Sequence, residues 1–102
     1  MYNGYWESDL IRTFKDKETQ KVYHQVFSRK LPPSIQRAAL RKMMIMDHVE
    51  NLSQLNNPPG NHLEALHGDR EGSWSIRIND QFRICFRYEE QDFYDVEITD
   101  YH

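Results

Sequence analysis

The 102-residue sequence has few of the features that mark secreted or membrane-spanning proteins. It contains a single cysteine, Cys85, so no disulfide can form within the chain, which is typical of proteins in a reducing cytosol. No stretch approaches the roughly 20 consecutive apolar residues that a membrane span requires. A basic segment followed by an apolar stretch is also lacking at the N-terminus. We therefore expect a small cytoplasmic protein without membrane contact.

Metal ligands at familiar spacings are lacking too. Five histidines are present, and His62 and His67 lie closest together, with Glu64 between them. A zinc site needs three or four converging ligands, and the sequence has neither a helical His-x-x-x-His nor a Cys-x-x-Cys pattern. We expect no metal site and no cofactor. Cys85 is interpreted as a small strand residue rather than a nucleophile.

The sequence also lacks an excess of positive charge. Thirteen Lys and Arg residues against 16 Asp and Glu residues give a net charge of -3, whereas domains that bind phosphates are usually basic. The arginines are concentrated, however, at Arg70, Arg77, Arg83 and Arg87. This pattern predicts a local basic site inside an acidic surface and argues against unaided binding to naked RNA.

What the sequence does contain is a helical periodicity in its first half. Residues 10–14 predict a short strand, and Asp16 resembles the N-cap of a helix that runs to about His24. After Pro32-Pro33, residues 34–50 carry apolar side chains every three or four positions, which predicts a second helix with a buried stripe. The stripe comprises Ile35, Ala39, Met43, Met46 and Val49.

The period changes to two beyond the loop at residues 56–61. The predicted strands are residues 62–66, 74–78, 82–88 and 93–99, with a tight turn at Asn79-Asp80-Gln81. In the last strand, Tyr94, Val96 and Ile98 are expected to point inward. The sequence thus predicts an α+β fold, in which an N-terminal strand and two helices pack on one face of an antiparallel sheet. Residues 10–102 form one domain, and residues 1–9 precede it as an extension.

Alternation along the two central strands predicts one polar sheet face. That face carries Ser75, Arg77, Arg83, Cys85 and Arg87. It has two interpretations: a solvated surface decorated with arginines, or an anion-binding site. Like charges on adjacent strands repel, so a neutralising partner is expected in either case. Asp95 and Glu97 are candidates, and so is a phosphate group.

The chain ends in Asp100-Tyr101-His102. A terminal histidine is ordinarily an exposed, frayed residue. Here the last predicted strand leads directly into it, which offers a place beside the arginine face. Histidine titrates near neutrality and is the usual general acid or base, so both interpretations stay open.

Several segments together resemble the HigB toxins, also called plasmid maintenance system killer proteins, of the RelE/ParE superfamily. They are Gly68-Asp69-Arg70-Glu71-Gly72, Trp74-Ser75-Ile76-Arg77-Ile78-Asn79, Arg83-Ile84 and Asp100-Tyr101-His102. The resemblance extends from about Leu10 to His102 and implies a RelE-like fold. It also implies the toxin of a type II toxin-antitoxin system: an endoribonuclease that cleaves mRNA in the ribosomal A site without a metal.

The resemblance implies attack of a ribose 2′-hydroxyl on the adjacent phosphate, with a 5′-hydroxyl leaving. Arg83 and His102 match active-site positions of the family, and Asp100 and Tyr101 complete the terminal motif. We expect Arg83 to stabilise the phosphate, His102 to transfer a proton, and Tyr101 to orient or stack on a nucleotide. Arg77 is added to the catalytic set from strand alternation alone.

Further residues are assigned by inference around this set. Arg70, Arg87 and Asp100 are expected to bind substrate. Many relatives carry a lysine just before the Gly-Asp-Arg segment, where this chain has His67. His67 is either a catalytic base or a replacement that lacks the fixed charge of lysine.

The resemblance also implies partners: a HigA-like helix-turn-helix antitoxin, mRNA, and the 30S A site of the ribosome with its rRNA. The toxin-antitoxin complex is expected to bind operator DNA through the antitoxin. The alternative is a non-catalytic toxin of the ParE type or another partner-binding module, because this fold alone does not settle the activity.

Overall fold

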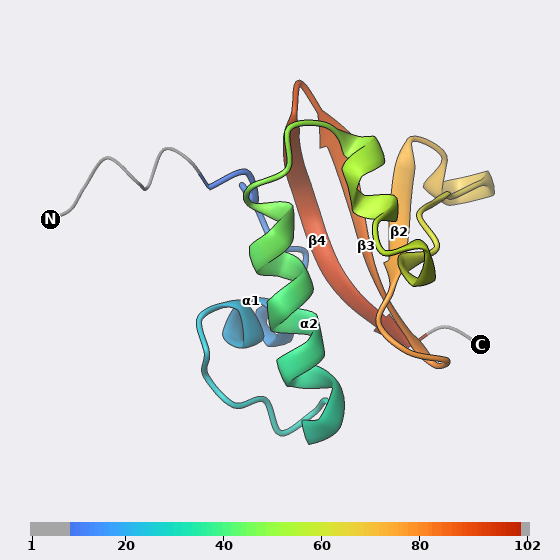
Figure 1. Ribbon diagram of the computed structural model, residues 1–102. Helices are drawn as coiled ribbons and strands as arrows, with labels where there is room; N and C mark the ends of the chain where they lie inside the picture. The colour runs from blue at the N-terminus through green and yellow to red at the C-terminus, as the bar shows by residue number, and fades with distance from the viewer. Residues whose placement is uncertain (1–8, 101–102) are drawn as a thin grey trace, which may run out of the picture.

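The computed structural model describes residues 9–100, so Tyr101 and His102 lie outside the described residues. Helices α1 (Lys17–Tyr23) and α2 (Pro33–Met46) lie together on one face of a four-stranded sheet (Figure 1). The strands are antiparallel and follow the order β1 (Glu64–Ala65), β2 (Ser73–Arg77), β3 (Phe82–Glu89) and β4 (Asp92–Asp100). Short 3-10 helices lie between α2 and β2: η2 (Leu52–Asn56), η3 (Pro59–Asn61) and η4 (Gly68–Arg70). The predicted α+β architecture is confirmed.

Asp16 begins α1 as the sequence predicts. Its carboxylate accepts hydrogen bonds from the backbone N–H of Thr19 at 3.1 Å and from the Thr19 hydroxyl at 2.7 Å. The same hydroxyl oxygen accepts the backbone N–H of Ile98 at 2.9 Å. The capping residues therefore also attach α1 to β4, and Thr19 is fully buried at this junction.

The buried stripe of α2 is confirmed for Ile35, Ala39, Met43 and Met46, none of which exceeds 3% exposure. The helix ends at Met46, earlier than the predicted end at residue 50. Asp47 follows as the C-cap, and its buried carboxylate accepts the backbone N–H groups of Leu10 at 3.1 Å and Ile11 at 2.9 Å. Its other oxygen accepts the hydroxyl of Tyr23. These contacts fix the N-terminal segment to the end of α2.

The predicted N-terminal strand is an extended segment rather than a continuous strand. It runs parallel to β4 and pairs with it at two isolated bridges, Ile11 with Phe93 and Phe14 with Val96. The two bridges place this segment beside the first half of β4. The ladder is interrupted where β4 itself departs from regular geometry.

That irregularity is a β-bulge at Asp95, whose φ angle is 54°. The β3–β4 register shifts between Cys85 and Arg87, so β4 contains one residue more than β3 at this point. Phe93 and Val96 consequently both reach the core, and each is fully buried. The prediction that Tyr94 points inward is wrong: Tyr94 is half-buried, and the Arg87 guanidinium lies 5.4 Å from the centre of its ring.

The core lies between the helices and one face of the sheet, where Ile76, Ile84 and Phe86 of the central strands meet α1 and α2. Trp74 and Ile78 pack at its margin. The turn between β2 and β3 forms where predicted. Asn79 stabilises the turn, because its side-chain oxygen accepts the N–H groups of Gln81 and Phe82, both at 2.8 Å.

The predicted strand at residues 62–66 is reduced to the two residues of β1. Within residues 9–100, no helix combines the length and apolar character that crossing a membrane would require.

Candidate active site

The sheet register places the predicted polar residues on a common face. Arg77 pairs with Arg83, Ser75 pairs with Cys85, and Ser73 pairs with Arg87. Directly paired residues of an antiparallel ladder project to the same side, so the alternation prediction is confirmed for the two central strands.

This face is not the open solvated surface of the first interpretation. Ser75 and Cys85 are buried, and the side chain of Arg83 is only 10% exposed. The arginine side chains lie along the face instead of projecting away from it. Arg83 reaches across β2 toward β1, and Arg70 reaches β4. Arg83 therefore lies against Ser75, with which it forms hydrogen bonds.

Arg83 is held by neutral acceptors. Its Nε donates to the Ser75 hydroxyl at 2.8 Å, and its Nη2 donates to the backbone carbonyls of His62 at 2.5 Å and Ser75 at 3.4 Å. The Glu64 carboxylate lies 3.6 Å from the same Nη2. A planar guanidinium bonded from several directions is fixed in orientation, as transition-state stabilisation requires.

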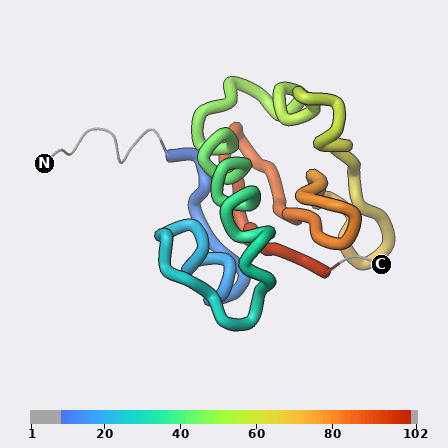
Figure 2. The backbone as a smooth tube through the Cα atoms, turned by 60° about the horizontal axis from the view of Figure 1, so that its bottom comes forward, coloured from blue at the N-terminus to red at the C-terminus, as the bar shows by residue number. Residues whose placement is uncertain are grey.

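Arg77 and Asp100 lie at the same end of the sheet as Arg83. Asp100 pairs with Phe82 in the β3–β4 register, and its carboxylate accepts the side-chain amide of Gln81 at 3.2 Å. Figure 1 and Figure 2 both show the end of β4 beside the β2–β3 turn. Arg77 forms an ion pair with the exposed Asp80. We call Arg77, Arg83 and Asp100 the chain-end cluster.

A further cation adjoins this cluster from the helix layer. Burial lowers the pKa of Lys42 on α2, and the nearby charges of Arg41 and Arg77 lower it further. The Lys42 ammonium donates to the side-chain oxygen of Asn61, a buried residue. Positive charge is therefore concentrated around Arg77.

Arg70 and Arg87 form a second cluster toward the other end of the sheet. Arg87 lies four positions after Arg83 along β3, which corresponds to about 13 Å along an extended strand. Arg70 pairs with Glu97 at 2.8 Å, and Arg87 pairs with Asp95 at 2.9 Å. The hydrogen bond that Arg87 donates to Asp95 raises the pKa of Arg87, although partial desolvation opposes this effect.

A pocket of about 150 Å³ lies within this Arg70–Arg87 cluster. Its lining includes Lys15, Asp69, Ser73 and Cys85 together with both arginines and Asp95. Carboxylates balance the positive charges here, so the pocket does not offer the excess positive charge that a phosphate would need. The structure thus divides the predicted site residues between two places.

His67 lies on the side of the second cluster. It immediately precedes η4, and the neighbouring Leu66 donates its backbone N–H to the Ser73 carbonyl at 2.8 Å. His67 lies three positions after Glu64, the carboxylate paired with Arg83. Glu64 is the site residue that sequence reasoning missed, although its predicted strand already ran beside the polar face.

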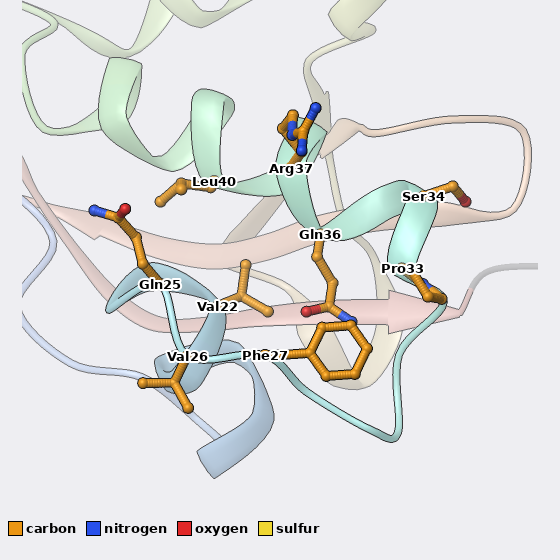
Figure 3. Close-up of a pocket in the computed structure, with 9 residues that line it drawn as sticks. All are labelled: Val22, Gln25, Val26, Phe27, Pro33, Ser34, Gln36, Arg37 and Leu40. Atoms are coloured by element: carbon orange, nitrogen blue, oxygen red, sulfur yellow. The ribbon is translucent and has the colours of Figure 1, made fainter.

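A larger pocket of about 660 Å³ lies on the helix side of the molecule, where α1, the following loop and α2 meet (Figure 3). Val22, Val26, Phe27 and Leu40 provide apolar side chains, and Arg37 contributes a charge at its rim. This pocket does not contain the paired acidic and basic groups of the chain-end cluster. We therefore place the candidate chemistry on the sheet face.

Within residues 9–100, no three His, Cys, Asp or Glu side chains converge as a metal site.

Two helices on one face of a four-stranded antiparallel sheet, with arginines on the other, define a small α+β domain of the RelE-like class. Residues 12–102 match the family model described as RelE-like toxin of type II toxin-antitoxin system HigB. The match covers most of the sequence, so the chain belongs to this family.

Individual relatives agree with this assignment. The chain is 41% identical to Toxin HigB-1 of Vibrio cholerae serotype O1 over 76 residues, which cover 74% of this chain and 80% of that protein. It is 28% identical to Endoribonuclease HigB of Proteus vulgaris over 93 residues, which cover 91% of this chain and all of that protein. An uncharacterised protein of Haemophilus influenzae is 35% identical over 63 residues, or 62% of each chain.

Proposed function

We propose that this toxin is a ribosome-dependent endoribonuclease that cleaves mRNA in the A site and thereby inhibits translation. The main support is the fixed Arg83 guanidinium at the sheet end where β4 terminates, two residues before His102. The Proteus vulgaris relative, aligned over its whole length, is named an endoribonuclease. A fixed cation at the end of the sheet where β4 terminates suits phosphoryl transfer from RNA.

In the proposed reaction, the ribose 2′-oxygen attacks the adjacent phosphorus and the bond to the 5′-oxygen breaks. Arg83 stabilises the negative charge that develops on the phosphate oxygens. His102 donates a proton to the departing 5′-oxygen, and Tyr101 orients or stacks on a nucleotide. Side chains supply the proton donor, proton acceptor and positive charge, so the proposed mechanism uses no metal or cofactor.

The charge distribution supports dependence on the ribosome. Arg70, Arg77 and Arg87 each have a carboxylate partner, and the whole chain carries a net charge of -3. Binding to free RNA depends mainly on phosphate contacts that release counterions. With these arginines neutralised, the protein would grip naked RNA weakly, whereas the ribosome already holds the mRNA in place.

A toxin of a type II system implies a neutralising antitoxin. We propose a HigA-like partner with a helix-turn-helix domain, through which the complex would bind operator DNA. Both proteins are expected to act in the cytoplasm.

The test is to add the purified protein to a bacterial translation extract and map the mRNA ends. We expect new ends within A-site codons in the presence of ribosomes and little cleavage of the same RNA alone. His102→Ala should abolish cleavage, whereas His48→Ala, which removes an exposed histidine of the helix layer, should not. An intact mRNA population would contradict the enzyme proposal and favour the non-catalytic, ParE-like alternative.

A further inference from the structure

We propose that Lys42 and Asn61 are positioning residues that hold Arg83 in the orientation needed for cleavage. This inference rests on the proposed endoribonuclease function, in which Arg83 stabilises the charge that develops on the phosphate. It starts from an acceptor of Arg83 that lies outside the central strands. The Ser75 hydroxyl belongs to β2, whereas the His62 carbonyl, which accepts Nη2 at 2.5 Å, belongs to the loop that follows η3. A loop carbonyl orients a guanidinium well only where the loop itself is held.

The backbone of His62 has an unusual conformation. Its φ angle of 47° and ψ angle of 62° lie in the left-handed region, and its N–H donates to the Pro59 carbonyl at 3.0 Å. A residue other than glycine stays in this region where the surrounding structure fixes its backbone. A change of His62 to an ordinary φ angle would redirect its carbonyl and remove this acceptor from Arg83. The loop therefore needs an anchor close to His62.

Asn61 provides that anchor. It immediately precedes His62 and is 3% exposed. Its backbone N–H donates to the Pro58 carbonyl at 2.9 Å, and its side-chain Nδ2 donates to the Leu55 carbonyl at 2.9 Å. Leu55 is itself buried in the hydrophobic core. Asn61 thus connects the end of η3 to a part of the loop that the core already holds.

Lys42 completes the contacts of the Asn61 side chain. Its ammonium, which comes from α2, donates to Asn61 Oδ1, while Asn61 Nδ2 donates to the Leu55 carbonyl on the other side. A side-chain amide with a cation at its oxygen and a carbonyl at its nitrogen has one favourable orientation. Met43, the next residue of α2, is fully buried, so the helix that carries Lys42 is fixed in the core. A continuous path therefore leads from α2 through Asn61 and His62 to Arg83.

A direct attraction of RNA by the Lys42 charge is the alternative role. Burial lowers the pKa of Lys42, and the charges of Arg41 and Arg77 lower it further. Burial of the ammonium favours positioning, because a group that attracts phosphates acts best when it is exposed to them. The contact with Asn61 points the same way, since Asn61 is buried and lies inside the loop rather than on its surface.

The expected effect is on the rate of the chemical step rather than on binding. A guanidinium that turns away from its fixed orientation still attracts RNA, but it stabilises the transition state less well. A small misplacement of a catalytic group can cost up to about 100-fold in rate. Loss of a positioning residue should therefore lower the maximal rate and leave the half-saturating concentration nearly unchanged.

The test measures single-turnover cleavage of a defined mRNA on purified bacterial 70S ribosomes at increasing toxin concentration. We expect Lys42→Met, which keeps the apolar stem, to lower the maximal rate about 10-fold or more. Lys42→Gln keeps a donor for Asn61 without the charge, so it should recover most of that loss. Lys17→Met is the matched control, because it removes the same group from an exposed position of α1, and its rate should stay within about twofold.

Asn61→Ala tests whether the two residues act along one path. Its loss in rate should be at least that of Lys42→Met, and adding Lys42→Met to it should slow cleavage by less than about twofold more. The NMR signal of the Arg83 Nε–H group reports the orientation of Arg83 without ribosomes. We expect this signal to shift in Lys42→Met and to return toward its original position in Lys42→Gln, each measured where the spectrum is that of a folded protein.

Three results would overturn the positioning role: an unchanged maximal rate in Lys42→Met, equal losses in Lys42→Met and Lys42→Gln, or an unmoved Arg83 signal. Equal losses would assign to Lys42 a direct charge effect on RNA. Multiplied losses in the double variant would contradict a shared path. Absence of cleavage by the unmodified protein would refute the endoribonuclease proposal, whereas the NMR comparison would still decide whether Lys42 orients Arg83.

Discussion

Replacing Arg83 by alanine should destabilise the fold as well as remove activity. The guanidinium donates at 2.8 Å to the Ser75 hydroxyl and at 2.5 Å to the His62 carbonyl. Hydrogen bonds that involve a charged group each contribute about 1.5–3 kcal/mol, and releasing a buried charge into water offsets part of that gain. We therefore expect Arg83→Ala to lower the free energy of unfolding by roughly 3 kcal/mol.

Urea denaturation followed by tryptophan fluorescence measures this change directly. For a domain of this size, each kcal/mol lowers the melting temperature by about 4–8 °C, so a fall of roughly 10–25 °C is expected. Arg83→Lys keeps the charge but lacks the planar fork that reaches two acceptors at once, so about half the loss should remain. An Arg83→Ala protein within about 0.5 kcal/mol of the unmodified chain would refute the description of Arg83 as a fixed group.

This result decides how cell-based experiments are interpreted. Relief of growth arrest by Arg83→Ala is expected from a smaller folded population, even if Arg83 takes no part in the chemistry. The catalytic role must therefore be measured on folded Arg83→Lys protein at a temperature well below its transition.

Three further predictions concern stability. Asp47→Ala should cost roughly 2–4 kcal/mol in urea denaturation, because the buried N–H of Ile11 loses its acceptor; Asp47→Asn, which keeps a side-chain oxygen, should cost less. Burial raises the pKa of the Tyr23 hydroxyl, and its hydrogen bond to Asp47 raises it further. As pH rises above about 10, this hydroxyl therefore ionises in the unfolded chain before it does in the folded protein, and the free energy of unfolding falls. Tyr23→Phe should reduce this loss of stability at alkaline pH. The same dependence of unfolding free energy on pH in both proteins would contradict the prediction. Glu90 and Gln91 form the turn between β3 and β4, and both have positive φ angles, which are strained for residues other than glycine and asparagine. Replacing the pair by Asn-Gly should therefore raise the free energy of unfolding by about 1 kcal/mol. An unchanged melting temperature would show that the turn is not strained.

The sequence alone predicted those features that a local pattern of residues determines. The stripe from Ile35 to Met46, the cap at Asp16 and the turn at Asn79 each follow from spacing within a few residues, and all are confirmed. Alternation also predicted that Arg77 and Arg83 share a face.

The remaining features depend on contacts between distant parts of the chain. The bulge at Asp95 has no local signal, because the extra residue is not glycine, and it reversed the expected orientation of Tyr94. The burial of Arg83 was unexpected because arginine is rarely buried without partners, and its partners come from another strand and a loop. Asp47 also lacks a local signal, because the backbone N–H groups that it accepts belong to Leu10 and Ile11, more than 30 residues earlier in the chain.

The position of the N-terminal segment beside β4 has a consequence for the timing of folding. The Thr13 hydroxyl accepts the N–H of Asp95, 82 residues away, and Thr19 accepts that of Ile98, 79 residues away. Contacts between such distant residues form only after a costly chain closure. β4 is also the last strand to be synthesised, at about 5–20 residues per second. The sheet therefore cannot be completed before β4 has been synthesised, so the N-terminal segment waits for partners that lie 82 and 79 residues later in the chain.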